Sequence, residues 1–544
     1  MAYVITQGCC NDAACISVCP VDCIRPKPGD PDFMSAEQLY IDPVSCIDCA
    51  ACLWECPVSA IHDEYDLPAS LNVFKEINAE YFELHPLEES TPASRPARML
   101  SEQQPSLRVA VIGAGPSGCY AVAELNAIPG VEVSVFDRLP TPYGLVRAGV
   151  APDHQNTKAV ANQFREILEK PNVTCYFNVE IGNDITIGEL LERHHAVIFS
   201  AGANDDRRLG IPGEELKGSH SAREFVAWYN GHPDFTQRAF DLSGERVVII
   251  GNGNVALDVA RVLAAPAEAF DPTDMSQHAV EALRTSGVRE VVVSARRGAL
   301  DAAFTTGEFL ALAQVEQIDV VALSDEVRFE IDVGPTSRYG AKRRLALAVE
   351  ASKVIPDENR RRIIFRFMLT PISINGTDAV ESVTFRRTSD PAALDEILDT
   401  KLVLRAIGYR GTEFSGLPYD QATGIIPHIA GRVQAPGNGG DLAGVYCTGW
   451  AKRGATGIIG TNKVDAAETV TALFDDYSAS KLRAPALLAE NIGLFVASRQ
   501  ADVVGFAQWL KIDAEEVARG SGSVVAKARH KLHDVAEMVH VALR

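Results

Sequence analysis

Short apolar runs that lead into glycine-rich turns recur along this chain, and they predict the parallel strands of an α/β fold. The first run is Arg108–Ile112, which is followed by a helical pattern over Cys119–Leu125 and by a second run over Val131–Phe136. The same order returns with the runs Arg246–Ile250 and Glu290–Ser294, which enclose another helical stretch. Buried strands that alternate with helices are typical of parallel sheets. The pattern therefore predicts two separate parallel sheets covered by helices.

The segments that flank these units follow other patterns. From His62 to Leu107 the sequence becomes polar, and Pro86–Pro105 holds four prolines, which predicts an exposed linker. Within this region Leu71–Phe82 is more apolar and predicts a short helix that packs on the N-terminal block. The last 70 or so residues have a helical pattern. No uncharged apolar stretch reaches the roughly 18 residues of a membrane-spanning helix, so we expect none.

The length of 544 residues predicts two to four domains, and a hydrophobic content of 47% is typical of globular proteins. The first residues lack the basic segment and the apolar core of a secretory signal, so we expect a cytoplasmic protein.

The net charge of −21 is concentrated at the N-terminus. Residues 1–105 hold 17 acidic and 5 basic side chains, a net charge of −12, which leaves −9 for the rest. Nucleic acid is an unsuitable partner for such a chain. The acidic block could dock on a basic surface of another protein, but ordinary solubility explains the same charge.

Two cysteine runs in the acidic block have the spacing of iron–sulfur ligands. The second run is C-x2-C-x2-C-x3-C-P, and the first has the same frame except that Asp12 stands at the second position. The cysteines of the two runs are Cys46, Cys49, Cys52 and Cys56, and Cys9, Cys15 and Cys19. Zinc sites commonly use separated pairs of ligands, and disulfides are unexpected in the absence of a signal peptide, so both alternatives fit less well.

In two-cluster proteins with this motif, the last cysteine of each run ligates the other cluster. The first predicted site is a 4Fe–4S cluster with four thiolates: Cys46, Cys49, Cys52 and Cys19. The second predicted site has three thiolates: Cys9, Cys15 and Cys56. Three thiolates suit a 3Fe–4S cluster, unless the Asp12 carboxylate or water completes a second 4Fe–4S cluster. Cys10 lies next to Cys9 and leaves the identity of that ligand open, whereas Cys10 and Cys23 are expected not to be ligands.

These residues resemble the seven-iron bacterial ferredoxins over Tyr3–Tyr65. The resemblance includes Cys-Pro-Val-Asp-Cys at Cys19–Cys23 and Tyr-Ile-Asp-Pro at Tyr40–Pro43. It implies an α+β two-cluster ferredoxin domain at the N-terminus. Many members of that family have two more residues between the first two ligand positions.

Each predicted parallel sheet begins with a glycine fingerprint of dinucleotide binding. Gly113-Ala-Gly115-Pro-Ser-Gly118 follows the first strand, and the next strand ends in Asp137, an acid that binds a ribose hydroxyl. Gly251-Asn-Gly253-Asn-Val-Ala256 follows the first strand of the second sheet, whose next strand ends in Arg296 and Arg297. Arginines there suit the 2′-phosphate of NADPH. The first site therefore suits FAD and the second suits NADPH, although a solvated strand end would also explain the arginines.

Electron chemistry connects the three kinds of site. NADPH donates two electrons together, flavin releases them singly, and iron–sulfur clusters accept one at a time. The cysteines after Cys56 stand alone, which argues against a disulfide reductase. We also find no convincing Ser/His/Asp nucleophile.

Three long segments resemble adrenodoxin reductase: Pro140–His154, Gly251–Arg261 and Tyr446–Gly460. The similarity covers about Leu107–Met538, and together with the head the chain is similar to the actinobacterial ferredoxin/ferredoxin–NADP reductase fusions. This resemblance implies an α/β fold with two Rossmann-type domains. It places the ferredoxin domain at 1–65, a linker at 66–105, an FAD domain at 106–205 and 410–544, and an NADP domain at 206–409.

The resemblance also implies site residues. Those for FAD are Gly113, Gly115, Ser117, Gly118, Asp137, Leu145, Ile181, Trp450, Gly457, Ile458 and Ile459. Those for NADP are Asn252, Gly253, Asn254, Val255, Arg296, Arg297, Glu308 and Gly457. His154 and Asp258 would lie near the flavin, where they could relay protons or order water, although a lone histidine is often only a structural turn residue.

We therefore predict an NADPH–ferredoxin oxidoreductase that passes electrons from NADPH through FAD to its own clusters. The final acceptor would be a protein such as a ferredoxin or a cytochrome P450. Two alternatives are the NADPH-oxidising subunit of a larger enzyme, as in glutamate synthase, and a non-catalytic redox carrier. We expect no nucleic acid or membrane as partner.

Overall fold

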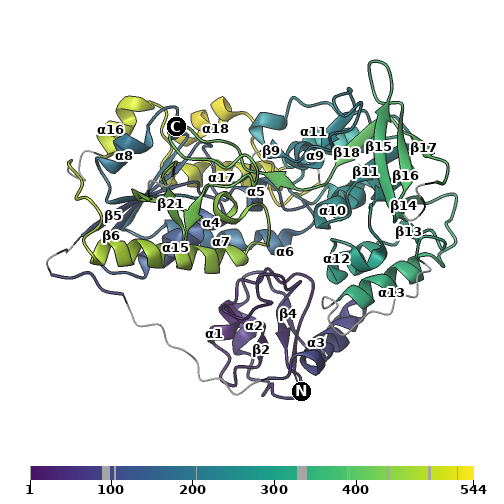
Figure 1. The fold of residues 1–544 in the computed structure, drawn as a ribbon, viewed down its shortest axis with the longest axis horizontal. Helices are drawn as coiled ribbons and strands as arrows, with labels where there is room; N and C mark the ends of the chain where they lie inside the picture. Colours follow the sequence, from purple (N-terminus) through teal and green to yellow (C-terminus); the bar gives the residue numbers. More distant parts are fainter. Residues whose placement is uncertain are drawn as a thin grey trace.

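The computed structural model describes residues 2–87, 98–102, 104, 106–203, 205–327, 340–388, 390, 392–437, 440–487, 492–523 and 525–544. They form a small N-terminal part and two larger α/β parts that lie side by side (Figure 1). The N-terminal part, residues 2–87, is called the head. It lies beneath both α/β parts, with its last helix next to the second of them (Figure 1).

Two short antiparallel strand pairs and three helices form the head. Strand β1 pairs with β4, and β2 pairs with β3. The bounds are β1 (Tyr3–Ile5), α1 (Ala14–Ser17), β2 (Ile24–Arg25), β3 (Tyr40–Ile41), α2 (Ala51–Glu55), β4 (Ile61–Asp63) and α3 (Val73–Leu84). The apolar face of α3 buries Phe74, Ile77 and Tyr81 against Val4 and Tyr40. The predicted helix at Leu71–Phe82 is therefore confirmed, with its start and end two residues later.

The first α/β part contains a seven-stranded sheet with the order β20-β21-β22-β8-β5-β6-β7, of which β22 to β7 run parallel. Helices α4 and α15 pack against each other, and α17 packs against β7. The strands are β5 (Leu107–Ile112), β6 (Val131–Asp137), β7 (Val173–Phe177), β8 (Ala196–Phe199), β20 (His428–Ile429), β21 (Arg432–Gln434) and β22 (Asp441–Cys447). The helices are α4 (Pro116–Asn126), α5 (Leu145–Ala148), α6 (Gln155–Lys158), α7 (Val160–Leu168), α8 (Ile187–Leu191), α14 (Trp450–Arg453), α15 (Thr461–Ser478), α16 (Ile492–Arg499), α17 (Phe506–Ser521) and α18 (Val535–Leu543).

The second α/β part contains a six-stranded parallel sheet with the order β10-β18-β11-β12-β14-β13 and a three-stranded antiparallel sheet, β15-β16-β17. The strands are β10 (Ser219–Ser221), β11 (Arg246–Ile250), β12 (Glu290–Ser294), β13 (Ile318–Ala322), β14 (Arg361–Arg366), β15 (Leu369–Asn375), β16 (Ser382–Arg387), β17 (Glu396–Asp399) and β18 (Leu402–Arg405). The helices are α9 (Ala222–Tyr229), α10 (Asn254–Ala264), α11 (Gln277–Arg284), α12 (Thr306–Ala313) and α13 (Ala341–Ala351). The chain enters and leaves this part through β9 (Asp205–Asp206) and β19 (Tyr409–Arg410), which pair with each other.

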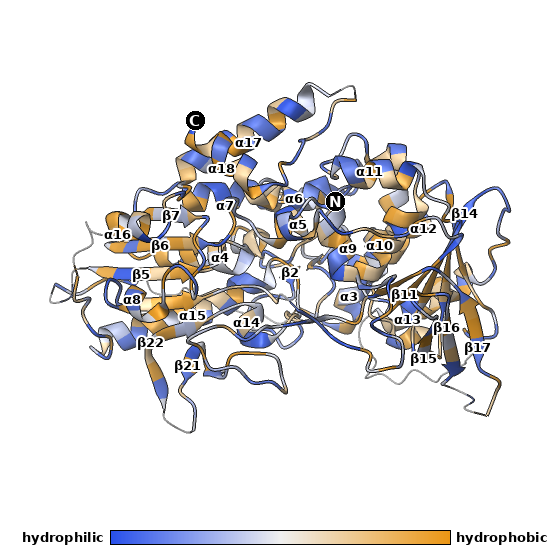
Figure 2. Cartoon of the chain, turned by 90° about the horizontal axis from the view of Figure 1, so that it is seen from above, coloured by the Kyte–Doolittle hydropathy of each residue, from blue (hydrophilic) through white to orange (hydrophobic). Residues whose placement is uncertain are grey.

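The apolar runs of the sequence become the central strands of the two sheets. β11 and β12 have the predicted bounds, and β5 and β6 are one residue longer than predicted. β5 and β6 are coloured mostly as hydrophobic in Figure 2. The sheet β15-β16-β17 was not predicted. Most of the predicted linker, Pro86–Pro105, lies outside the described residues, and no helix in the described part is long and apolar enough to span a bilayer.

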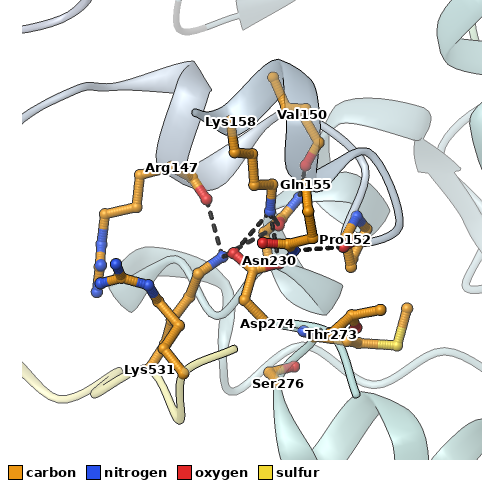
Figure 3. Close-up of polar contacts among 12 residues, drawn as sticks. Arg147, Val150, Pro152, Gln155, Lys158, Asn230, Thr273, Asp274, Ser276 and Lys531 are labelled. Carbon is orange, nitrogen blue, oxygen red and sulfur yellow. Dashed lines mark hydrogen bonds and ion pairs between the residues drawn. The ribbon is translucent and has the colours of Figure 1, made fainter. Parts of the chain in front are cut away.

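A buried ion cluster joins three distant segments at the boundary between the two α/β parts (Figure 3). Asp274 pairs with Lys158 at 2.7 Å and with Lys531 at 2.8 Å, and all three side chains are at least 90% buried. Lys531 also donates to the carbonyl oxygen of Arg147 at 2.9 Å. Burial alone would raise the pKa of Asp274, but Lys531 and Lys158 outweigh burial and lower it. The carboxylate is therefore the counterion that both buried lysines require.

We predict that Asp274→Asn destabilises the protein by about 3–5 kcal/mol, because it leaves two buried ammonium groups without a counterion. The measurement is the decrease in the thermal unfolding midpoint of the variant relative to wild type, followed as a function of pH. Since the folded pKa of Asp274 is depressed, its contribution is complete above the unfolded pKa of about 4 and disappears as pH falls further. The deficit should therefore be constant at neutral pH and shrink in acid.

Asp271→Asn is the matched control, because Asp271 pairs with the partly exposed Arg284. Exposed ion pairs contribute only about 0–1 kcal/mol. Equal losses from the two substitutions at neutral pH would contradict the role given to Asp274.

Candidate functional site

The first glycine fingerprint forms a tight turn between β5 and α4. Gly113 has a φ of 102°, a conformation that favours glycine. A Cβ on Gly118 would overlap the carbonyl oxygen of Gly113, so this position admits only glycine. Asp137 accepts hydrogen bonds from the backbone of Ala114 at 2.8 Å and of Leu139 at 3.0 Å. The acid at the end of β6 thus lies directly against the turn.

Several other residues predicted to contact FAD surround this turn. Gly144, which precedes Leu145, approaches Gly115 so closely that a Cβ on it would lie 3.1 Å from the Gly115 Cα. Thr448, two residues before Trp450, also lies beside this turn, because the Ser117 hydroxyl donates to the Thr448 hydroxyl at 3.4 Å. Trp450 stacks on Tyr409 with ring centroids 5.4 Å apart and donates to Thr456, one residue before Gly457. Ile181 is buried beneath the strand ends, in one cluster with Ile112 and Phe136.

The second fingerprint forms the equivalent turn between β11 and α10. Gly251 has a φ of 111°, and a Cβ there would overlap the carbonyl oxygen of Ala406. The Asn254 side chain accepts from the backbone of Thr305 at 2.8 Å, which fixes the chain before α12 beside the turn. The amide nitrogen of the Asn252 side chain is buried, and the described residues give it no partner. Gly253 and Val255 complete this turn and the first residues of α10.

The two arginines that follow β12 are exposed. Arg297 makes one long contact with Asp301, 3.9 Å between Nη1 and Oδ1, and both side chains are more than 60% exposed. Exposure at the carboxyl end of a parallel strand next to a glycine turn is what a phosphate ligand requires. A solvated strand end would be exposed in the same way.

His154, Asp258 and Glu308 converge between the two α/β parts, with ligand-type atoms within 4.8 Å of one another. Burial raises the pKa of Glu308 to about 7, and the negative charge of Asp258 adds to this effect. Oε2 of Glu308 is buried, and within the described chain it has no hydrogen-bond partner. His154 and Asp258, which the sequence analysis placed near the flavin, and Glu308, which it assigned to NADP, therefore form one cluster.

Arg261 is the residue of this cluster that sequence analysis did not assign. Its guanidinium contacts Asp153 at 2.7 Å, Asp258 at 2.6 Å and His154 Nε2 at 3.0 Å, and its Nη1 lies 3.9 Å from Glu308 Oε2. Because arginine only donates, Nε2 of His154 accepts, and the imidazole proton lies on Nδ1, which is 3.9 Å from Asp258. The sequence feature that could have identified Arg261 is its i,i+3 spacing from Asp258 on one helix. The arginine charge also makes this cluster a poor cation site.

Four thiols of the head that the motif rule groups together line one small pocket. They belong to Cys19, Cys46, Cys49 and Cys52, as the motif rule predicts for the first cluster. Burial raises the pKa of Cys52 to about 12, and the charges of Cys46, Cys19 and Cys49 add to this. Thiols this crowded need a metal cation to become thiolates together. Cys23 also lines the cavity and lies 3.4 Å from the Cys19 sulfur.

Three more thiols meet on the other side of the head core. Burial raises the pKa of Cys15 well above its ordinary value, and Cys9 and Cys56 are the strongest charges that add to this. Burial likewise raises the pKa of Cys9 to about 11, with a further contribution from Cys56. Cys10 instead packs with the first α/β part, in one core cluster with Val58 and Tyr120.

The two ligand loops of the head have the same backbone conformation. Asn11 and Ala13 have φ values of 54° and 64°, and Asp48 and Ala50 have values of 56° and 60°. A short helix follows each loop, α1 or α2. This correspondence places Asp12 at the position that Cys49 occupies in the second loop. Cys49 is exposed, whereas Asp12 is only 4% exposed.

The first ligand loop packs directly on the first α/β part. The backbone nitrogen of Gly460 donates to the carbonyl oxygen of Cys10 at 2.8 Å. A Cβ on Gly460 would overlap the backbone of Asn11. Ile459, one residue earlier, packs against the core cluster that contains Cys10. The three-thiol site therefore lies against the turn Gly457–Ile459, and the four-thiol loop faces solvent.

The head also contacts the second α/β part. Glu37 accepts from the backbone of Thr306 at 2.8 Å and forms an ion pair with Arg344. Glu80 pairs with Arg343 at 2.6 Å. The head is thus held by contacts to both α/β parts, which together are called the body.

We predict that Gly118→Ala and Gly115→Ala have different effects. Ala at 118 overlaps the Gly113 carbonyl, and overpacking costs about 1–3 kcal/mol or more, so the thermal midpoint falls and flavin is lost. Ala at 115 meets nothing closer than 3.8 Å, so the fold is kept while bound flavin falls. Flavin absorbance per chain and thermal unfolding measure both effects. Full flavin binding by Gly115→Ala would contradict the placement of the pyrophosphate at this turn.

Comparisons with known proteins agree with this geometry. Residues 107–300 match the family model described as pyridine nucleotide-disulphide oxidoreductase. The chain is similar to FprA of Mycobacterium tuberculosis, solved in complex with NADPH, with 39% identity and a TM-score of 0.75. This match covers 81% of this chain and 100% of that chain. A protein named NADPH-ferredoxin reductase FprA from the same species is 42% identical over 80% of this chain and 99% of its own.

Other relatives include the head as well as the body. A protein of Mycobacterium leprae named probable ferredoxin/ferredoxin–NADP reductase is 44% identical, over 100% of this chain and 98% of its own length. One from Mycobacterium tuberculosis with the same name is 46% identical, over 100% of this chain and 95% of its own. The chain therefore belongs to the family of ferredoxin/ferredoxin–NADP reductases.

Proposed function

We propose that the protein is an NADPH–ferredoxin oxidoreductase that reduces the iron–sulfur clusters of its own head and, through them, a protein acceptor. When bound, NADPH supplies two electrons together, FAD separates them, and the clusters take one each. One observation carries this proposal: the head is docked with its first ligand loop on the turn Gly457–Ile459, through the bond from Gly460 to Cys10. The printed names of the full-length relatives support it.

The residues proposed to hold the cofactors follow the geometry of the turns. For FAD they are Gly113, Gly115, Ser117, Gly118, Asp137, Leu145, Ile181, Trp450 and Gly457–Ile459. For NADP they are Asn252–Val255, Arg296, Arg297, Glu308 and Gly457. Within the described residues, the side-chain nitrogen of Asn252 and Oε2 of Glu308 are buried without a hydrogen-bond partner, which supports a polar ligand at these groups. The β9–β19 pair supports domain boundaries near residues 205 and 410.

The cluster around Arg261 is proposed to manage protons. His154 holds a proton on Nδ1, facing Asp258, while Arg261 fixes the ring through Nε2. Arg261 also pairs with Asp258 beside Glu308, whose pKa of about 7 lets it exchange a proton near neutral pH. We propose that these residues orient the nicotinamide end of the coenzyme and buffer protons there.

For the metal sites we propose a 4Fe–4S cluster on Cys19, Cys46, Cys49 and Cys52, and a 3Fe–4S cluster on Cys9, Cys15 and Cys56. Cys9 is favoured over Cys10 because Cys9 packs in the head core with Cys15 and Cys56, whereas Cys10 is not part of that core. The three-thiolate site then lies next to the flavin turn, and the four-thiolate site lies at the solvent side, where Cys49 is exposed. Electrons would leave the protein there, toward a ferredoxin, a cytochrome P450 or another redox protein.

We predict that replacing Arg296 and Arg297 together by Ala raises the KM for NADPH strongly and barely changes the KM for NADH. Each charge-assisted contact to the 2′-phosphate is worth about 1.5–3 kcal/mol, which is roughly ten- to a hundredfold. Steady-state kinetics with both coenzymes, using ferricyanide as acceptor, measure the change. Equal losses with the two coenzymes would show that the arginines have another role.

We predict that a fragment starting at residue 106 keeps FAD and its NADPH–ferricyanide activity but loses about tenfold or more of its cytochrome c reduction. The match of this body to the whole of a solved chain supports its folding alone. Full-length Cys49→Ala, which keeps the head docked, should lose cytochrome c reduction likewise. If truncation leaves both rates unchanged, the head does not lie on the electron path.

A further inference from the structure

Asp12 takes the place of a cluster ligand, but its carboxylate is held by the body. Tyr120, on helix α4, donates from its hydroxyl to Oδ2 of Asp12 at 2.8 Å. Lys463, on helix α15, lies 3.7 Å from the same oxygen. The other carboxylate oxygen accepts from the backbone of Ala14 at 3.2 Å. Both oxygens of Asp12 are therefore engaged.

The backbone does not prevent Asp12 from ligating iron. Its loop has the same pair of left-handed residues as the loop of Cys49, and α1 follows it as α2 follows the other. Asp12 also lies three residues from both Cys9 and Cys15, as Cys49 lies three residues from both Cys46 and Cys52. The backbone of Asp12 therefore has the position of a cluster ligand. Its side chain instead contacts Tyr120 and Lys463 of the body.

We propose that docking on the body keeps the first cluster at three irons, because Tyr120 and Lys463 compete with iron for the Asp12 carboxylate. The inference rests on the proposed three-thiolate site and extends it. When the head is released from these two side chains, Asp12 becomes free to ligate a fourth iron. The contacts of Tyr120 and Lys463 with Asp12 thus determine whether the cluster next to the turn Gly457–Ile459 holds three or four irons.

The chemical step is balanced as follows. One electron from dithionite reduces the 3Fe–4S core from a charge of +1 to 0. A ferrous ion then adds to this core and gives a 4Fe–4S core of charge +2, with the Asp12 carboxylate as the fourth protein ligand in place of a thiolate. For the carboxylate to reach the iron, its hydrogen bond to Tyr120 and its contact with Lys463 must break. A charge-assisted hydrogen bond of this kind shifts an equilibrium by roughly ten- to a hundredfold.

The test uses the full-length protein with Tyr120→Phe, with Lys463→Met and with both. Tyr120→Phe keeps the ring that packs edge-on against Phe164 and removes only the hydroxyl. Tyr446→Phe is the matched control, because Tyr446 makes the same kind of buried bond to Asp476, at 2.9 Å, within the same α/β part. Each protein is reduced with dithionite, incubated anaerobically with ferrous ion and reoxidised. The EPR signal of the oxidised three-iron cluster and the iron content are then measured.

We expect wild type and Tyr446→Phe to keep the three-iron signal and about seven irons per chain. The double variant should lose the signal about tenfold faster or more and gain about one iron. Adding Asp12→Asn to the double variant should restore the signal, because an amide is a poor iron ligand. Lys463→Met alone, at a partly exposed position, should give an intermediate rate and remains informative if Tyr120→Phe misfolds.

Three results would overturn the proposal: a double variant that behaves like wild type, a failure of Asp12→Asn to restore the signal, or eight irons with no three-iron signal in wild type. NADPH-dependent bleaching of the cluster absorbance in the same wild-type sample tests the proposed function separately. If bleaching fails while the EPR pattern holds, the electron route is wrong and the role of Asp12 stands.

Discussion

The close approach of two backbones, at Asn11 in the head and Gly460 in the body, is the constraint on which the arrangement of the whole molecule depends. No side chain fits between them, because even a Cβ on Gly460 would overlap Asn11. The approach fixes which of the two similar ligand loops faces the body. It follows that the pseudo-symmetry of the head is broken by docking, since one loop is buried and the other is left at the surface.

Neutralisation of buried charge determines how the remaining parts meet. Asp274 lies between Lys158 and Lys531, and Arg261 lies among three carboxylates; both clusters are at the boundary of the two α/β parts. A buried ion tolerates little displacement of its partner, because separation leaves an uncompensated charge in a medium of low dielectric constant. The boundary is therefore specified by side-chain chemistry as much as by shape.

Much of the fold could be predicted from local sequence. The strands β5, β11 and β12 have apolar runs, β6 has alternating apolar residues, and the glycine turns have fixed spacing, so each carries its own signal. Contacts between segments far apart in the chain carry none: nothing near Asp12 indicates Tyr120, and nothing near Asp274 indicates Lys531. The sheet β15-β16-β17 was missed because its strands are partly exposed and polar. The spacing of Asp258 and Arg261 on one helix indicates their own contact, but nothing near Arg261 indicates its contacts to Asp153 and His154, about 107 residues away.

The position of the docking surface in the chain has a consequence for biosynthesis. The head leaves the ribosome first, but its dock requires Gly460 and Lys463, and β22 must insert beside β8 before the first sheet is complete. The first 463 of the 544 residues must therefore be made before the head can dock. During that interval the body does not cover the first ligand loop, and the loop is buried only when synthesis is nearly finished. Because the head precedes its docking surface in the chain, the first ligand loop is uncovered only until the fold is complete.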